Sequence, residues 1–196
     1  MSFDFKKDPF ENFLELFKAA QIKGIPEHNA MALATVNQNS QPSVRIVLFK
    51  GLINRGFCFF TNYDGRKGQE LEKNKNVAAT FFWPHLEQQI RIEGQAEKLT
   101  EEESDKYFST RPRLSQIGAW SSNQSEKIDS FESFQKKINA IDKKFEGQPV
   151  TRPPHWGGYR IVPTEIEFWF GKAGRLHERY VYQNLNNQWD RFLRSP

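Results

Sequence analysis

The spacing of apolar residues changes once near the start of the chain, and this change constrains the fold more than any other feature. Phe10, Phe13 and Phe17 follow the three- and four-residue spacing of a helix, which Asp8 can cap and Pro9 can begin. From residue 31 onward apolar and polar residues alternate, a pattern typical of β-strands. The segments expected to be strands are 31–36, 42–50, 57–61, 77–83, 88–99, 159–163, 165–170 and 178–183, followed by a last strand near the C-terminus.

Helical spacing returns at three places between these strands. The segments are 65–74, a helix that Thr100 and Glu103 can begin as a capping box, and 128–145. Because the helices do not alternate regularly with the strands, a parallel β-α-β fold is disfavoured. The predicted fold is therefore mainly β with flanking α-helices, an antiparallel barrel in architecture.

The composition indicates a folded protein with a polar surface. The chain has 196 residues, which suits one domain, and 18 Phe, 5 Tyr and 5 Trp exclude a disordered chain. Its net charge of +4 is small and acidic stretches lie among the basic ones, whereas nucleic-acid binders concentrate positive charge on one face. No apolar run approaches the roughly 20 residues of a membrane span. We therefore expect neither a nucleic-acid nor a membrane partner.

The single cysteine, Cys58, excludes an intramolecular disulfide and is typical of a reducing compartment. The first residues, MSFDFKKDPFENF, place charges where a signal peptide needs an apolar core. A cytoplasmic protein is expected. Cys58 lies between two Phe residues, so a core position is favoured over a nucleophile.

Common catalytic motifs are missing from the sequence. The four histidines are dispersed without the i, i+4 or CxxC spacing of a zinc site. A GxSxG elbow, a Walker loop and a GxGxxG motif do not occur, which disfavours the hydrolase and nucleotide folds that use them.

Basic residues at strand ends and helix starts are the remaining candidates for a site. Arg45 and Lys50 are five positions apart, so on a regular strand they would point to opposite faces and serve different groups. Arg66 and Lys67 stand at the expected start of a helix, where free backbone N–H groups favour an anion. The alternative for this pair is a solvated helix start.

Two further sets share a regular spacing. Tyr107, Arg111 and Ser115 recur every four residues and would share one face of a helix if that helix continued past Pro112; a break at Pro112 is the alternative. Two separate anion clusters in a small barrel suggest two phosphates. In 175–179, Arg175, His177 and Arg179 alternate, so on a strand all three would project from one face. The alternative is an exposed edge whose charges oppose aggregation.

Five segments together resemble the pyridoxamine 5′-phosphate oxidase family. They are RIVLFK (45–50), FTN with GRK (60–62 and 65–67), RPRLSQIGAW (111–120), WGGYR (156–160) and EFWFGKAGRLHER (167–179), in the family's order and spacing. The resemblance implies an FMN-binding split β-barrel, antiparallel and Greek-key-like, over residues 27–196. This domain would include the C-terminal dimerisation and active-site segment. Residues 1–26 would form an N-terminal helix and arm.

The resemblance also implies an activity and a set of contacts. The reaction is oxidation of pyridoxamine or pyridoxine 5′-phosphate by dioxygen to pyridoxal 5′-phosphate and hydrogen peroxide, in a homodimer with FMN at the interface. The implied FMN contacts are Arg45, Ile46, Val47, Leu48, Phe60, Thr61, Arg66, Lys67, Gln89, Gln124, Ser125, Trp169 and Arg179. The implied contacts to the substrate phosphate are Lys50, Tyr107, Arg111 and Ser115, while Arg175 and His177 would be catalytic and contact the vitamin ring.

The sequence departs from the family pattern at three positions. Phe60 stands where many members have Tyr, Phe170 replaces a usually small or polar residue, and Gln88 stands where Arg is common. Two other functions stay open: a non-catalytic carrier of FMN or pyridoxal phosphate, and a flavin oxidase of another ring such as a phenazine precursor. Arg175 with His177 argues against the first, and the substrate-phosphate set argues against the second.

Overall fold

The computed structural model describes residues 3–186 and 188–196. The helices in this part are α1 (Pro9–Ile22), α2 (Arg66–Lys73), α3 (Glu101–Ser109), α4 (Arg113–Ser121) and α5 (Phe131–Lys144), with short 3₁₀ turns at Pro84–Leu86 and Ala173–Arg175. The strands are β1 (Ala30–Val36), β2 (Pro42–Leu48), β3 (Leu52–Ile53), β4 (Gly56–Asn62), β5 (Asn76–Trp83), β6 (Gln88–Lys98), β7 (Trp156–Phe170), β8 (Glu178–Leu185) and β9 (Gln188–Leu193). Among the described residues, no helix is both long and apolar enough to cross a bilayer.

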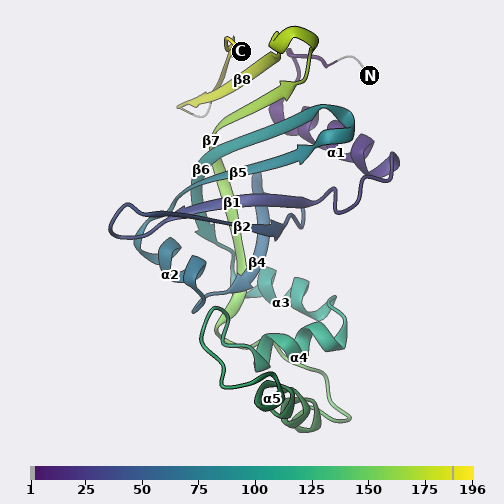
Figure 1. Ribbon diagram of the computed structural model, residues 1–196, viewed down its shortest axis with the longest axis vertical. Helices are drawn as coiled ribbons and strands as arrows, with labels where there is room; N and C mark the ends of the chain where they lie inside the picture. Colours follow the sequence, from purple (N-terminus) through teal and green to yellow (C-terminus); the bar gives the residue numbers. More distant parts are fainter. Residues whose placement is uncertain (1–2, 187) are drawn as a thin grey trace.

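The strands form one antiparallel sheet that coils without closing. Its order is β2-β1-β5-β6-β7-β4-β3, with β8 on β7 and β9 on β8. Figure 1 shows β1 and β2 crossing β4 at a steep angle, the form of a split barrel. The mainly β, antiparallel prediction is confirmed. The sheet stays open in the described residues because β2 and the two-residue β3 remain at its edges.

Two predicted strands, 159–163 and 165–170, are one continuous strand in the structure, so that division was wrong. β7 runs from Trp156 to Phe170 and pairs with β6 through a register shift between Glu93 and Gly94. Pro163 lies opposite this irregularity and has no amide hydrogen to donate, so the shift lets β7 continue past it. A Cβ on Gly94 would lie 2.2 Å from the Val162 carbonyl oxygen, which explains the glycine.

Helix α1 packs into the main core. As expected, Asp8 caps it by accepting a hydrogen bond from the Phe10 amide at 2.9 Å. Phe13 is fully buried, and its ring lies 4.8 Å from that of Phe57 and 5.2 Å from that of Phe81. The helix therefore shares the aromatic core of the sheet. The division of the chain at residue 26 stays a prediction.

Helices α3, α4 and α5 gather at the other end of the sheet, around the start of β7 (Figure 1). A second core cluster of Phe108, Ile117, Phe145 and Trp156 joins them. The capping box of Thr100 and Glu103 is confirmed. The helix predicted over 128–145 begins at residue 131, because a Ser130 cap fixes its start.

Candidate active site

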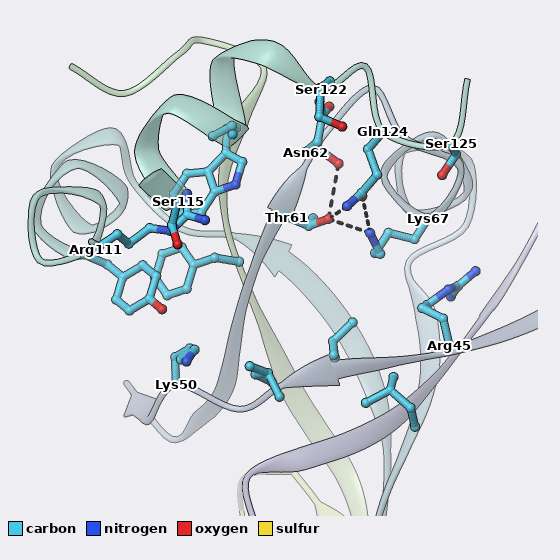
Figure 2. Close-up of a pocket in the computed structure, with 18 of the residues that line it drawn as sticks. Arg45, Lys50, Thr61, Asn62, Lys67, Arg111, Ser115, Ser122, Gln124 and Ser125 are labelled. Atoms are coloured by element: carbon cyan, nitrogen blue, oxygen red, sulfur yellow. Dashed lines mark hydrogen bonds between the residues drawn. The ribbon is translucent and has the colours of Figure 1, made fainter. Parts of the chain in front are cut away.

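A pocket of about 1100 Å³ lies between β2, β4, α2 and the segment from α3 to residue 125 (Figure 2). It unites fourteen of the residues that the family resemblance assigned to FMN or substrate. These are Arg45, Ile46, Val47, Leu48, Lys50, Phe60, Thr61, Arg66, Lys67, Tyr107, Arg111, Ser115, Gln124 and Ser125. The neighbouring lining includes Ser43, Asn62, Ser122 and Trp156.

One end of the pocket is formed by Lys67 and the start of α2. Gly65 caps this helix without a side chain, so its first N–H groups meet no side-chain cap. Lys67 is 9% exposed, and its Nζ donates hydrogen bonds to Thr61 Oγ1 at 2.6 Å and to Gln124 Oε1 (Figure 2). A helix start beside a buried cation is a site for an anion.

The environment of Lys67 disfavours its charged form. Burial, and to a smaller extent the neighbouring Arg45 cation, together lower the pKa of the Lys67 ammonium to about 8. Arg45 and Arg66 both pair with the carboxylate of Glu70, at 3.1 and 2.9 Å. Three cations and one carboxylate therefore stand at this end.

The other end of the pocket is formed by Arg111 and an aromatic stack. The Arg111 guanidinium lies 4.6 Å from the Trp156 ring centroid, and its Nη1 is buried without a hydrogen-bond partner among the described residues. Burial lowers the pKa of Arg111. The Phe60 ring stacks on Tyr107 at 3.8 Å and an interplanar angle of 17°. A buried guanidinium with an unused donor is suited to a second anion.

The positions of two residue sets in this pocket differ from those predicted from the sequence. Tyr107 lies on α3 and Ser115 on α4, while Arg111 lies in the break between them, so the three do not share one continuous helix. Pro112 caps α4 and ends the continuity. Arg45 and Lys50 do not serve opposite faces of the sheet, because β2 ends at residue 48; both line this pocket, at its two ends (Figure 2).

The remaining predicted site residues form a second group away from the pocket. Gln89, Trp169 and Arg179 lie side by side on β6, β7 and β8. His177 packs its ring 4.6 Å from that of Trp169. Figure 1 shows the β7–β8 turn at the opposite end of the molecule from α3 and α4.

The common face that a strand would give Arg175, His177 and Arg179 does not form, although the strand predicted over 178–183 is present as β8. Arg175 lies in a 3₁₀ turn with φ of 61°, His177 precedes the strand, and only Arg179 lies on β8. Gly174 has φ of 67°, so two successive left-handed residues end the strand pattern here. The Arg179 guanidinium donates to both carboxylate oxygens of Glu167 at 2.9 Å.

Sequence reasoning missed the buried carboxylates of Glu70 and Glu167. Their side chains are only 5% and 2% exposed, yet each pairs with an arginine that was assigned to FMN. For Glu70 the i, i+4 spacing from Arg66 was a usable signal. Cys58 is fully buried, as predicted, and burial raises the pKa of its thiol to about 11.

Comparison with known proteins decides the family. Residues 17–145 match the family model described as pyridoxamine 5′-phosphate oxidase, and residues 156–196 match the pyridoxine 5′-phosphate oxidase C-terminal dimerisation region. The chain belongs to the pyridoxamine 5′-phosphate oxidase family.

Relatives within this family match along nearly the whole chain. A pyridoxine/pyridoxamine 5′-phosphate oxidase of Bdellovibrio bacteriovorus is 54% identical over 99% of this chain and 100% of its own length. One of Leptospira biflexa is 51% identical over 96% of this chain and 89% of its own. Among solved structures, PhzG of Burkholderia lata in complex with tetrahydrophenazine-1-carboxylic acid superposes with a TM-score of 0.94 at 29% identity, covering 100% of this chain and 98% of that one.

Proposed function

We propose that this member of the family oxidises pyridoxamine 5′-phosphate and pyridoxine 5′-phosphate to pyridoxal 5′-phosphate, with FMN as cofactor and dioxygen as oxidant. The observation that carries the proposal is one pocket with a cationic site at each end. A flavin mononucleotide and a phosphorylated vitamin bring one phosphate each, and a phosphate carries close to two negative charges at neutral pH.

The residues present fit FMN. The helix start with Lys67 offers a buried cation and backbone donors to the flavin phosphate. The volume of about 1100 Å³ leaves room for two ring systems. The unused Nη1 of Arg111 marks a separate place for the substrate phosphate.

When bound, FMN supplies the two-electron oxidation, with hydrogen peroxide as the second product. The protein's own residues then bind and orient. Arg111, Lys50, Tyr107 and Ser115 hold the substrate phosphate, which fixes the ring in position for reaction. The Phe60–Tyr107 stack walls this end of the pocket and excludes water from it.

We assign Arg175 and His177 to the vitamin ring, supplied by the second copy of a homodimer. Within one protomer these residues lie away from the pocket, at the β7–β8 turn. The family model over 156–196 is a dimerisation region, and it contains this turn. The exposed apolar side chains of Val44 and Ile46 on the edge strand β2 support a partner next to the pocket.

Oxidation of a phenazine precursor is the rival activity, because the PhzG structure has nearly the same fold. Its ligand, tetrahydrophenazine-1-carboxylic acid, has no phosphate. Lys50, Arg111 and Ser115 would then lack their ligand group, which favours the phosphorylated vitamin. A non-catalytic carrier would not need the turn that bears Arg175 and His177.

The test is the absorbance spectrum of the purified protein followed by steady-state kinetics with pyridoxine 5′-phosphate. An oxidised flavin gives bands near roughly 370 and 450 nm. Arg111→Ala should raise KM by about 10- to 100-fold, since a charge-assisted hydrogen bond is worth about 1.5–3 kcal/mol, with a smaller effect on kcat. Arg175→Ala should lower kcat as well as affinity. A flavin-loaded protein that does not form pyridoxal 5′-phosphate would refute the proposal.

A further inference from the structure

The carboxylate of Glu70 lies buried behind the cationic end of the pocket, and nothing in the proposed reaction uses it. Its side chain is 5% exposed. One oxygen accepts hydrogen bonds from Ser43 Oγ at 2.7 Å, from Arg45 Nη2 at 3.1 Å and from Thr35 Oγ1. The other accepts from Arg66 Nε at 2.9 Å.

These bonds join three elements around one charge. Thr35 lies on β1, Ser43 and Arg45 on β2, and Arg66 with Glu70 on α2. Burial alone would raise the pKa of Glu70, but the four hydrogen bonds outweigh it and lower the pKa to about 2. The carboxylate is therefore ionised at any physiological pH.

The opposite side of α2 is fixed by packing. A Cβ on Gly68 would lie 1.9 Å from the Tyr63 carbonyl oxygen, so the helix sits directly against the chain that follows β4. On the other side of the helix, Glu70 bonds α2 to β1 through Thr35 and to β2 through Ser43. Together they set where the start of α2 stands relative to Arg45.

Like charges at this end need a counter-charge to stay together. Arg45 is close enough to Lys67 to lower its pKa, which means that the two cations repel each other. Without Glu70, Arg45 and Arg66 would lose their shared charged acceptor, and Arg45 would keep only neutral acceptors, the oxygens of Leu33, Thr35 and Ser43. We propose that Glu70 is a positioning residue, which holds Arg45 and Arg66 beside Lys67 for the flavin phosphate; this rests on the proposed function.

If Glu70 acted only through its negative charge, its removal would change FMN affinity in the opposite direction. The two roles can therefore be distinguished by experiment. A carboxylate near an anion site weakens anion binding by Coulomb repulsion. If Glu70 acted only through its charge, Glu70→Gln would bind FMN more tightly. If it positions the arginines, the same change weakens FMN binding.

The experiment titrates flavin-free protein with FMN and with riboflavin, which lacks the phosphate. Glu70→Gln should raise the Kd for FMN by at least about tenfold, as expected for one charge-assisted bond, and change that for riboflavin by less than about twofold. Glu72→Gln is the matched control, because Glu72 lies on the same helix, is exposed and pairs only with Lys98 among the described residues. It should leave both constants unchanged.

Ser43→Ala provides a second variant, which keeps every charge and removes the hydroxyl that donates to Glu70 at 2.7 Å and accepts from Arg45 Nη2 at 2.5 Å. It should weaken FMN binding by about threefold or more, again without affecting riboflavin. FMN binding that is unchanged or tighter in Glu70→Gln, or an equal loss of both flavins, overturns the positioning role and leaves the proposed function standing. Wild-type protein that binds no FMN overturns both.

Discussion

At the scale of single residues, the pocket contains charged side chains that are buried without an oppositely charged partner among the described residues. Lys67 is nearly buried and has no carboxylate partner among the described residues; its Nζ donates hydrogen bonds only to Thr61 and Gln124 there. Arg111 likewise has a buried donor, Nη1, for which the described part of the chain offers no acceptor. Such groups destabilise a folded chain unless a ligand completes them, so they indicate binding rather than stability.

The lowered pKa of Lys67 predicts a pH dependence of flavin binding. Lys67 loses its proton in the free protein as the pH rises through about 8, whereas a bound phosphate favours the charged ammonium. FMN affinity should therefore fall above pH 8, by up to about tenfold per pH unit, until the pKa of the complex is reached. Fluorescence titration from pH 6.5 to 9.5 measures this.

Two comparisons isolate Lys67 as the cause of that decline. Riboflavin affinity should stay level over the same range, because no phosphate is present to meet the ammonium. In Lys67→Met, FMN affinity should be lower and lose its dependence on pH above 8. Persistence of the decline in this variant would assign it to another group.

At the scale of elements, the turn between β7 and β8 depends on the N-terminal segment. The Phe3 ring lies 5.1 Å from those of Phe168 and Phe170 and 4.8 Å from that of Tyr180. Phe170, one of the three departures from the family pattern expected from the sequence, thus has a local aromatic partner in this chain. Phe3 therefore packs against both strands that flank the turn with Arg175, β7 and β8.

Phe3→Ala should therefore loosen the turn without touching the pocket. Loss of a half-buried ring is expected to cost about 1–2 kcal/mol of stability, less than a fully buried Phe. We expect kcat/KM with pyridoxine 5′-phosphate to fall several-fold while the Kd for FMN changes little, if the dimer stays intact. Phe131→Ala, which removes an 83% exposed ring on α5, is the control. Equal kinetics in the two variants would contradict the role of Phe3 in holding the turn.

At the scale of the whole molecule, the predicted site residues of one protomer form two separated groups. The pocket lies beside α2 and α4, whereas Trp169, His177 and Arg179 gather near the β7–β8 turn. Strand β2, beside the pocket, exposes the apolar side chains of Val44 and Ile46. Two copies arranged about a two-fold axis can bring each pocket against the other copy's turn.

This arrangement predicts that flavin binding depends on protein concentration. Diluting the protein until it is monomeric should release FMN, because a monomer would retain only the pocket half of the site. Analytical ultracentrifugation detected at the flavin absorbance follows mass and cofactor together. Full retention of FMN by a proven monomer would show that the pocket alone is sufficient.

Local pattern was enough to predict much of the framework. The capping of α1 by Asp8 and the Thr100–Glu103 box depend on neighbours in the chain, so short-range rules predict them. Arg66 and Lys67 stand at the start of a helix for the same reason. The family itself could be inferred from the sequence because five motifs occur in order.

Tertiary structure alone decided how these pieces meet. Spacing by fours placed Tyr107, Arg111 and Ser115 on one helix, but they converge from α3, the break after it and α4 because Phe108 and Ile117 pack around Trp156. Glu70 looks like an ordinary surface residue of a polar helix until β1 and β2 cover it. A sequence records which charges a chain carries, but burial sets their pKa values and partners, and burial depends on contacts between residues far apart in the chain.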